Sequence, residues 1–555
     1  MKNWRMHFIV ALFCIAGLAL GGRLFFLQVA NHGFYKALAQ GQRISASFAE
    51  GERGNIFMRD KNGELVLLAT NQETPYAFVS PAEIEEREQT SKTLARILSL
   101  PESEVLQAVQ KKDSLFELIK RKITEEEKSA ILEADMKGMH VGFESLRYYP
   151  QGSFASQILG FVNQDGSGQY GVEEYENNLL SGKDGLQKNA LNPAAQLVSA
   201  LINTSQDGSD VILTIDYNVQ SMAEALLEEA QDALAVKEGS IIVADPKTGA
   251  ILALAELPSF NPNDYASISD FTLFQGGSVE KLFEPGSVFK AVTMASAIDE
   301  GAITPDTAYE DTGMLRIGGY KILNYDNRVW GERTMKEVLQ FSINTGAVFA
   351  KEQLGNRKFM EYAEKFGLFR PTGIELAGEV YSQNKELKQG YEINLANASF
   401  GQGIEMTAVQ LLRAYMAIAN SGKMLDPRIT EQETKEDFLQ VISPQSALTT
   451  TSMLVSVIEE GYSKKAKIPG YYIAGKTGTA QIAWSALGVK KSGYSDQTVQ
   501  SFVGYAPAYN PQFLILVKLN NPQAKTAEYS AMPLFKDLAK YLIDYLEIPP
   551  DYEVE

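Results

Sequence analysis

The chain opens with a long apolar run. Between residues 8 and 29 only Arg23 is charged, and nearly all other side chains are apolar. A helix of about 20 apolar residues spans a membrane, and the basic residues Lys2 and Arg5 favour a cytoplasmic N-terminus. We therefore expect residues 1–30 to form a cytoplasmic tip and a single transmembrane helix, with the rest of the chain outside the membrane.

A cleaved signal peptide is the alternative explanation of this run. Ala19-Leu20-Gly21 loosely resembles a cleavage site with two small residues. The apolar pattern continues beyond that site through residues 24–27, which favours the uncleaved anchor. A lipoprotein is disfavoured because the bulky Phe13 precedes Cys14.

Residues 35–205 mix short β-type runs with amphipathic helical stretches. Capping boxes at Ser80-Pro81-x-Glu83 and Thr124-x-x-Glu127 predict two helix starts, and Gly138 suits a helix end. This range holds no obvious catalytic motif. We expect an elongated α+β pedestal module here.

A sheet with helices is predicted from residue 208 onward. Residues 211–215 have the composition of a strand, and residues 217–234 have the pattern of a helix. Residues 240–244 and 250–255 predict a pair of strands around a Pro-Lys-Thr-Gly turn. We therefore expect a mixed α/β domain over residues 208–550.

Charge and composition exclude several kinds of function. The chain has 51 Lys and Arg against 69 Asp and Glu, a net charge of -18 that repels nucleic acid. One cysteine allows no disulfide framework, and the three histidines, His7, His32 and His140, lie early and scattered. A Ser-His-Asp triad or a histidine metal site is therefore hard to build, and we expect neither a metal nor an organic cofactor.

Ser287 and Lys290 form the first candidate catalytic pair. Proline and glycine precede the serine, and the alanine-rich residues 291–298 predict a helix after it. Residues three apart share a helix face, so the lysine can reach the serine oxygen. Burial and the positive helix N-terminus would favour a neutral amine that accepts the serine proton. Alone, Ser-x-x-Lys is a weak signal, because chance matches occur in a chain of this length.

Two further elements supply polar groups for such a site. Ser342 and Asn344, two residues apart, can face one cleft, where the hydroxyl relays a proton and the amide orients substrate. In Lys476-Thr477-Gly478-Thr479, after an expected strand at residues 471–474, the lysine and hydroxyls suit a substrate carboxylate. Gly478 allows close approach of a peptide to an exposed strand edge. Each element alone is weak.

The order of the three elements is informative. Ser-x-x-Lys, Ser-x-Asn and Lys-Thr-Gly in this order resemble the signature of penicillin-binding proteins and class A β-lactamases. Over nearly the whole chain the sequence is similar to class B penicillin-binding proteins. Further motifs that carry this resemblance are Arg53-Gly54-Asn55-Ile56, Arg147-Tyr148-Tyr149-Pro150, Leu213-Thr214-Ile215-Asp216 and Phe400-Gly401-Gln402-Gly403. Glu284-Pro285-Gly286-Ser287 and residues 501–507 resemble the division-associated, FtsI-like branch. One departure is Met58 to Gly63, where the family usually has Asp-Arg-x-Gly, which leaves the geometry of the module open.

The resemblance implies a fold and a set of roles. The fold is the penicillin-binding transpeptidase fold, an antiparallel sheet with a helical cluster, after a dimerisation-type pedestal. Ser287 becomes the nucleophile and Lys290 its base, with Ser342 and Asn344 as the proton-relay and orienting pair. Lys476, Thr477 and Thr479 become carboxylate binders beside Gly478, and the backbone N–H groups of Ser287 and Thr479 the oxyanion hole.

The implied reaction is the cross-linking of D-Ala-D-Ala stem peptides through an acyl-enzyme, with β-lactams as covalent inhibitors. Implied partners are peptidoglycan, a glycan polymerase of the SEDS family and other division membrane proteins. A D,D-carboxypeptidase or β-lactam hydrolase is the alternative within enzymes, and a non-catalytic division scaffold the alternative outside them. Residues 483–501 are expected to form a loop beside the cleft.

Overall fold

The computed structural model of the protein describes residues 45–49, 51–112, 114–183, 185–191, 197–201, 205–431 and 438–554. The predicted anchor, residues 1–30, lies outside these ranges, and no helix within them is long and apolar enough to cross a membrane. The chain divides into two compact units, Met1–Gly54 with Leu179–Ser209, and Asn55–Asn178 with Asp210–Glu555. Each unit is described by itself.

The first unit contains a three-stranded antiparallel sheet. Its strand order is β1-β8-β9, formed by β1 (Ser45–Ala49), β8 (Gly185–Leu191) and β9 (Leu197–Leu201). Arg53 lies in the Arg-Gly-Asn-Ile motif and donates a hydrogen bond to Ser181 Oγ at 3.0 Å. This contact gives the first residue of that motif a structural role within the unit.

The second unit begins with a five-stranded sheet and three helices. The long strand β3 pairs with β2 over residues 65–69, with β5 over residues 70–79 and with β4 over residues 77–79, and β2 also pairs in parallel with β10. Apolar side chains of the three helices pack with those at the C-terminal end of β3 into one core. The strands are β2 (Ile56–Arg59), β3 (Leu65–Val79), β4 (Glu117–Lys120), β5 (Met139–Tyr148) and β10 (Val211–Asp216), and the helices α3 (Arg87–Leu98), α4 (Glu102–Val109) and α5 (Glu125–Ala134).

Helix ends in this part agree only partly with the predicted caps. Thr124 caps α5 with both hydrogen bonds of a capping box to Glu127, which confirms that prediction. The helix start at Ser80 is wrong: the chain makes a turn there, in which Glu83 N donates to Ser80 O at 2.9 Å, and α3 begins at Arg87. Gly138 does not end a helix, since α5 stops at Ala134. Gly138, which has a positive φ, instead directly precedes β5.

The departure from the family pattern after β2 is a tight hairpin. Met58 and Arg59 belong to β2, and Gly63 N donates to Asp60 O at 2.9 Å in the turn toward β3. Gly63 has a φ of +79°, which glycine adopts without steric cost. The residues that depart from the family pattern therefore form the end of β2 and the hairpin turn, and β2 still pairs with β3.

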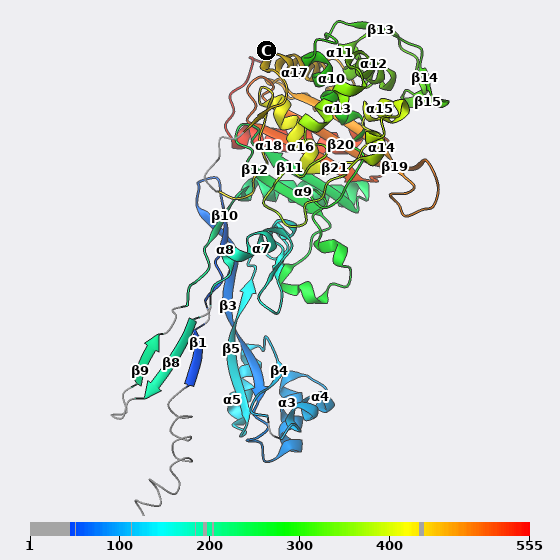
Figure 1. The fold of residues 1–555 in the computed structure, drawn as a ribbon. Coiled ribbons are helices and arrows are strands. Elements are labelled where there is room, and N and C mark those ends of the chain that lie inside the picture. The colour runs from blue at the N-terminus through cyan, green and yellow to red at the C-terminus, as the bar shows by residue number, and fades with distance from the viewer. Residues whose placement is uncertain are drawn as a thin grey trace, which may run out of the picture. The chain divides into compact units, whose positions relative to one another are not determined.

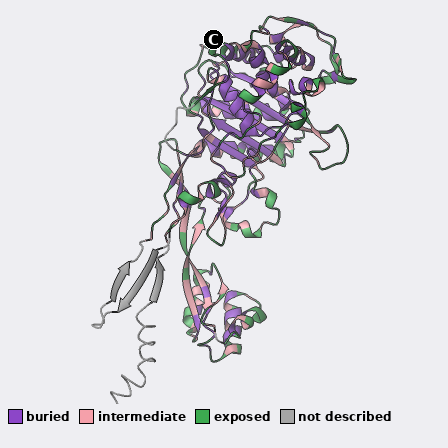
Figure 2. Ribbon diagram, in the orientation of Figure 1, coloured by how far each residue is buried: buried purple, intermediate pink, exposed green. Residues whose placement is uncertain are grey.

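The core of the second unit is a five-stranded antiparallel sheet in the order β12-β11-β21-β20-β19. Its inner strands carry continuous apolar runs such as the one at residues 513–517, as expected for strands covered on both faces. Helices α9 and α18 pack on one face, α16 and α17 contact strands from the other, and α10 to α13 extend the helical cluster (Figure 1). Buried residues are concentrated in this sheet and its helices (Figure 2).

The predicted strand, helix and strand pair at residues 211–255 are confirmed, although the first strand, β10, belongs to the sheet of β2 and β3. The strands of the core are β11 (Glu238–Ala244), β12 (Ile251–Leu257), β19 (Ala474–Ala483), β20 (Tyr494–Ala506) and β21 (Phe513–Asn520). The helices are α9 (Tyr217–Leu234), α10 (Lys290–Asp299), α11 (Met335–Gln340), α12 (Asn344–Leu354), α13 (Asn356–Lys365), α16 (Ala408–Ala419), α17 (Pro444–Glu459) and α18 (Ala531–Tyr545).

Short elements complete the described chain. Before the core these are α6 (Ser156–Leu159), β6 (Phe161–Val162), β7 (Gly168–Gln169), α7 (Gly171–Tyr175) and α8 (Asn177–Leu180). Within the core domain they are η2 (Pro262–Ser267), η3 (Phe271–Phe274), η4 (Gly286–Phe289), β13 (Ala308–Asp311), β14 (Met314–Ile317), β15 (Tyr320–Leu323), η5 (Tyr325–Asn327), β16 (Gly331–Thr334), α14 (Lys385–Lys388), α15 (Glu392–Ala398), β17 (Lys423–Met424), β18 (Leu439–Gln440), η6 (Lys464–Ala466) and η7 (Ala527–Tyr529).

Candidate active site

Ser287 lies in the 3-10 turn η4, which runs directly into α10. The backbone N–H of Lys290 donates to the carbonyl of Ser287, so one tight turn separates the two residues. Side chains three residues apart are eclipsed in a 3-10 turn, so the lysine and the serine extend from the same side of it. Ser287 is half-buried, whereas Lys290 is fully buried. A reactant can therefore reach the serine while the lysine stays out of water.

Small residues bring the edge strand β19 against this turn. A Cβ atom on Gly478 would lie 3.0 Å from the carbonyl oxygen of Pro285 and 2.5 Å from Ser501 Oγ. A Cβ atom on Gly286, which has a φ of +62°, would lie 2.9 Å from the Cβ atom of Ala480. Any larger side chain at either glycine would push strand and turn apart. Glycine here sets the distance between the Lys-Thr-Gly strand and Ser287.

Lys290 is the centre of a hydrogen-bond network that joins the three sequence elements. Its Nζ atom donates to Ser342 O at 2.6 Å and to Asn344 Oδ1 at 2.8 Å, and lies 3.2 Å from Ser342 Oγ. Lys476 Nζ donates to the same hydroxyl oxygen at 3.0 Å. Four of the predicted site residues are thus in direct contact, with the Ser342 hydroxyl between the two lysines.

The Ser-x-Asn turn is held by polar groups that the sequence did not single out. Ser342 has a φ of +55°, a strained conformation for a residue with a side chain. Asn324 Oδ1 accepts hydrogen bonds from the N–H groups of Asn344 at 3.0 Å and Thr345 at 3.2 Å. The buried carboxylate of Asp311 in turn accepts from Asn324 Nδ2 at 2.9 Å. These partners lie far away in sequence, so no local pattern could have indicated them.

Both lysines are electrostatically disfavoured as cations. Burial, and then repulsion from Lys476, hold the pKa of Lys290 well below its usual value. Burial lowers the pKa of Lys476 to about 7. A neutral Lys290 donates its two N–H groups to Ser342 O and Asn344 Oδ1 and keeps its lone pair for a hydroxyl proton. The predicted neutral base is thus favoured by burial and the second lysine, whereas the fixed charge expected at Lys476 is only partly present at neutral pH.

The threonines of β19 lie beside this network. Lys476 Nζ donates to the carbonyl of Thr477 at 3.1 Å, and Thr479 Oγ1 accepts from the backbone N–H of Ala527 at 3.2 Å. Both threonines are half-buried. Because the Thr479 oxygen acts as the acceptor, its hydroxyl hydrogen is available for a carboxylate.

Glu284 connects the nucleophile turn to the strand after the cleft loop. Its carboxylate accepts hydrogen bonds from the Tyr494 hydroxyl at 3.0 and 3.2 Å, and burial raises its pKa to about 7. The loop expected at residues 483–501 is shorter than predicted, because β20 already begins at Tyr494. No spacing rule pairs these two residues, which lie 210 positions apart.

Replacing Glu284 with glutamine is expected to change how stability depends on pH. The pKa of Glu284 is raised from its usual 4.5 to about 7, so the folded state binds the proton more tightly and wild-type stability falls as pH rises through this window. A glutamine at this position would not titrate. We expect the melting temperature of Glu284→Gln relative to wild type to be higher at pH 8 than at pH 5, by roughly 2 °C.

Thermal unfolding at the two pH values checks this expectation. Glu300→Gln is the matched control, because hydrogen bonding to Lys358 lowers the pKa of Glu300 and moves its titration below this window. Its melting temperature relative to wild type should be the same at pH 5 and pH 8. A Glu284→Gln difference that does not change with pH would contradict the expectation.

The fold and the site together define a class of protein. Within the described ranges, no cluster of three or more His, Cys, Asp and Glu side chains could hold a metal ion. The groups that converge at β19 and η4 are hydroxyls, lysines and an amide, on an antiparallel sheet with helices on both faces. This combination is that of a serine acyl-transfer enzyme, in which a buried lysine can take the place of a histidine base.

The chain belongs to the penicillin-binding proteins, and its two-domain composition is that of class B. The family model described as penicillin binding protein transpeptidase domain matches residues 239–540, and the model of the penicillin-binding protein dimerisation domain matches residues 48–213. The membership predicted from the three motifs is thereby confirmed, as is the mixed α/β transpeptidase fold with a preceding dimerisation module.

Relatives cover nearly the whole chain. Stage V sporulation protein D of Bacillus subtilis is 32% identical over 98% of this chain and 86% of its own length. Peptidoglycan D,D-transpeptidase FtsI of Buchnera aphidicola is 29% identical over 99% of this chain and 96% of its own. The crystal structure of penicillin binding protein 3 of Mycobacterium tuberculosis complexed with aztreonam is 26% identical, with a TM-score of 0.69, and covers 91% of this chain and 98% of that one.

Proposed function

We propose that this protein is a membrane-anchored D,D-transpeptidase that cross-links peptidoglycan stem peptides during septal cell-wall synthesis. The observation that carries this proposal is that Lys290 is fully buried one turn after Ser287 and is held by Ser342 and Asn344, which suits it to accept the serine proton. The relative from Buchnera aphidicola, named a peptidoglycan D,D-transpeptidase, supports the substrate class.

The proposed reaction is a two-step acyl transfer. Ser287 Oγ attacks the carbonyl carbon of the penultimate D-alanine, and its proton passes to Lys290. Collapse of the tetrahedral intermediate breaks the C–N bond, and the terminal D-alanine leaves with a proton supplied through Lys290 and Ser342. The amine of a second stem peptide then attacks the ester, gives up a proton by the same route and releases Ser287.

The remaining site residues bind and orient the donor peptide. The backbone N–H groups of Ser287 and Thr479 form the oxyanion hole, which stabilises the developing negative charge. Lys476, Thr477 and Thr479 bind the terminal carboxylate, whose charge would in turn favour the protonated form of Lys476. Gly478 lets the donor lie against β19, and Asn344 orients it while also holding Lys290.

β-Lactams fit the same site as covalent inhibitors. Their amide carbonyl takes the place of the D-Ala-D-Ala carbonyl, and the acyl-enzyme that forms on Ser287 hydrolyses slowly. The structures of penicillin binding protein 3 of Mycobacterium tuberculosis complexed with aztreonam and with ampicillin support this proposal, since their likeness to this chain extends over 91% of its length.

We assign the parts of the chain accordingly. Residues 1–30 anchor the protein in the bacterial cell membrane, residues 35–205 form an elongated pedestal, and residues 208–550 form an extracytoplasmic catalytic domain. A SEDS-family glycan polymerase and other division membrane proteins are the proposed partners of the anchor and pedestal. The apolar pattern of residues 8–29 and the match of the dimerisation model to residues 48–213 support this arrangement.

A product assay tests the proposed function against a hydrolase and a scaffold. The full chain in detergent is incubated with a stem peptide ending in D-Ala-D-Ala and a second stem peptide that carries a free side-chain amine. We expect release of D-alanine together with a cross-linked dimer. Release with only the shortened monomer would identify a D,D-carboxypeptidase, and no release with a folded protein would favour the scaffold.

A further inference from the structure

A row of polar residues crosses the core sheet from its far edge to the Lys-Thr-Gly strand. Glu256 on β12 pairs with Ser240 on β11, which pairs with Lys518 on β21. Lys518 pairs with Ser501 on β20, and Ser501 with Gly478 on β19. Directly paired residues of neighbouring strands share a face, so the row lies on the same face of the sheet as the site lysine of β19.

The segment that leads to the nucleophile crosses above this row. At its start, the carboxylate of Glu256 accepts hydrogen bonds from the backbone N–H groups of Gly277 and, at 2.7 Å, Ser278. At its end, the carbonyl of Pro285 lies against Gly478. Residues 276–286 therefore rest on Glu256 at one end and on the Lys-Thr-Gly strand at the other.

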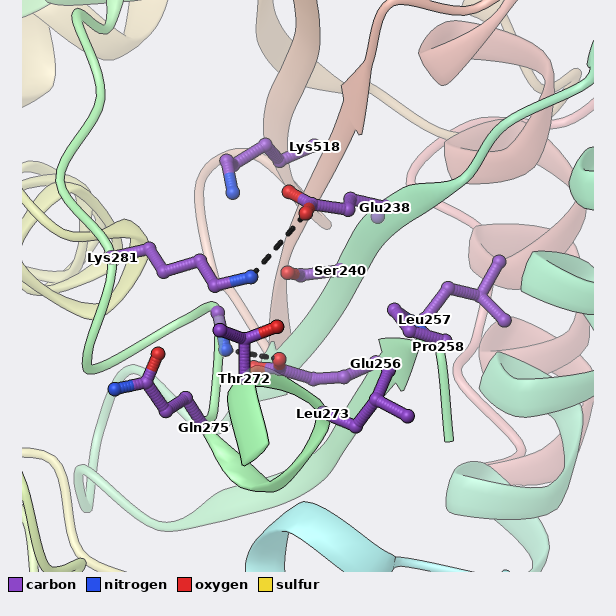
Figure 3. A pocket seen from close by; sticks show the side chains of 12 residues that line it. Glu238, Ser240, Glu256, Leu257, Pro258, Thr272, Leu273, Gln275, Lys281 and Lys518 are labelled. Carbon is purple, nitrogen blue, oxygen red and sulfur yellow. Dashed lines mark hydrogen bonds and ion pairs between the residues drawn. The ribbon is translucent and has the colours of Figure 1, made fainter. Parts of the chain in front are cut away.

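Lys518 lies between these two supports. Its Nζ atom is 5.3 Å from the ring centroid of Phe283, in the middle of the segment, and only 4% of the residue is exposed. Figure 3 shows Lys518, Ser240 and Glu256 around one small pocket, with the ion pair of Lys281 and Glu238 at 3.4 Å beside them. The Lys518 side chain thus lies against an aromatic side chain of the segment and lines the same pocket as the carboxylate that holds its start, with Ser240 between the two.

Burial makes this arrangement costly for stability. It raises the pKa of Glu256 and lowers that of Lys518, whereas the opposite charge of each works against the shift of the other. Buried charges of opposite sign are on balance weak contributors to stability, because desolvation offsets their attraction. An apolar pair of similar size would suit the fold as well, so the charges need another explanation.

The two backbone N–H groups of Gly277 and Ser278 explain why Glu256 carries a charge here. A carboxylate can accept both with its two oxygens, whereas an amide or a protonated acid presents one acceptor and one donor. Lys518 favours the ionised form that accepts both. The carbonyls of Ser278 and Val279 accept hydrogen bonds from Val409 N at 3.2 Å and Val380 N at 3.0 Å. Further along, Phe283 N donates to Met406 O and Gly286 N to Gly401 O, each at 2.9 Å.

We propose that Glu256 and Lys518 are a positioning pair for the nucleophile: Glu256 fixes the start of segment 276–286, Lys518 keeps Glu256 ionised, and the segment sets the place of Ser287 relative to Lys290. The inference rests on the proposed function, because it takes Ser287 as the acylated residue. Neither residue of the pair touches the substrate.

Acylation kinetics of the full-length protein with benzylpenicillin test this proposal, with binding (K) and chemistry (k2) resolved separately. Glu256→Gln is expected to lower k2 about 10- to 100-fold, with little change in K, because a displaced nucleophile loses reactivity before it loses substrate affinity. Glu224→Gln is the matched control: this half-buried carboxylate also accepts a backbone N–H, that of Ala155 at 2.8 Å, away from the nucleophile segment.

Lys518→Met supplies a second readout, which a purely structural role would not move. The charged groups facing Glu256 are Lys518 and Glu280, with the Glu238–Lys281 pair across the pocket. Loss of the ammonium leaves Glu256 beside negative charge, so it takes up a proton at higher pH. The ratio of k2 for Lys518→Met to k2 for wild type should fall as pH is lowered, and taking this ratio cancels the titration of Lys290.

The outcomes distinguish failure of the positioning pair from failure of the proposed function. A fall in k2 for Glu256→Gln but not for Glu224→Gln, with a pH-dependent ratio for Lys518→Met, supports the positioning pair. Wild-type k2 in Glu256→Gln, or equal losses in both glutamine variants, overturns it. If Glu256→Gln does not fold, a ratio for Lys518→Met that is constant with pH overturns it alone. Failure of the wild-type protein to acylate would instead overturn the proposed function.

Discussion

Replacing Ser287 with alanine is expected to abolish formation of the acyl-enzyme. Ser287 is the proposed nucleophile and is half-buried, and the fully buried Lys290 lies one turn after it. Removing the nucleophile of a serine enzyme costs about 10⁴-fold or more in rate, because the remaining groups have no atom to acylate. Intact-protein mass spectrometry after incubation with benzylpenicillin measures this: wild type should gain one penicilloyl adduct, and Ser287→Ala none.

Ser296→Ala is the matched control for this substitution. Ser296 lies on α10, the same helix, and its buried hydroxyl donates to the carbonyl of Val292 at 2.7 Å. It should acylate as wild type does. A full adduct on Ser287→Ala would show that another residue is the nucleophile. Loss of the adduct in both variants would show instead that the helix no longer folds correctly.

Lys290→Met is expected to lower the acylation rate constant by about 10²- to 10⁴-fold, the usual contribution of a general base. Methionine has similar length and no charge, and it removes a cation that burial disfavours, so the fold should tolerate it. The second-order rate constant for benzylpenicillin, measured across pH, gives the result. Wild-type rates should rise with pH as Lys290 loses its proton, and the variant should lose this rise.

Lys476→Met is the comparison that distinguishes loss of the proposed base, Lys290, from loss of a neighbouring positive charge. Repulsion from Lys476 contributes to the lowered pKa of Lys290, so removing Lys476 should raise that pKa and move the rise in rate to higher pH. The rate should therefore depend on pH in this variant, unlike in Lys290→Met. Equal rates and equal pH profiles for Lys290→Met and wild type would exclude Lys290 as the base.

Local patterns predicted several elements with correct bounds. The helix at residues 217–234 matches α9 at both ends, since Asp216 caps its first turn through hydrogen bonds to Asn218 N and Val219 N. The cap at Thr124 was predicted equally well. At Ser80 the same cap pattern was wrong, because the chain makes an isolated turn directly after β3 and α3 provides the helix later. A capping-box sequence permits a particular set of local hydrogen bonds, and tertiary packing decides whether they form.

In the candidate site, too, local motifs predicted some residues, and distant segments supply the others. The three motifs name Ser287, Lys290, Ser342, Asn344 and Lys476, and the hydrogen bonds of Lys290 and Lys476 join the second and third elements to the first. The supports of this network are not local. The Asp311–Asn324 pair beneath the Ser-x-Asn turn, Tyr494 at Glu284, and Lys518 in the pocket that Glu256 lines come from separate strands and loops that no spacing rule connects.

The sequence by itself determined the family, the chemical groups and the order in which they occur. It did so because the spacing within a helical turn and the residues of a strand are local properties of the chain. Only the tertiary structure decided which groups are buried, and burial sets the pKa of Lys290, Lys476 and Glu284. Desolvation depends on everything packed around an atom, and most of that packing comes from residues distant in sequence.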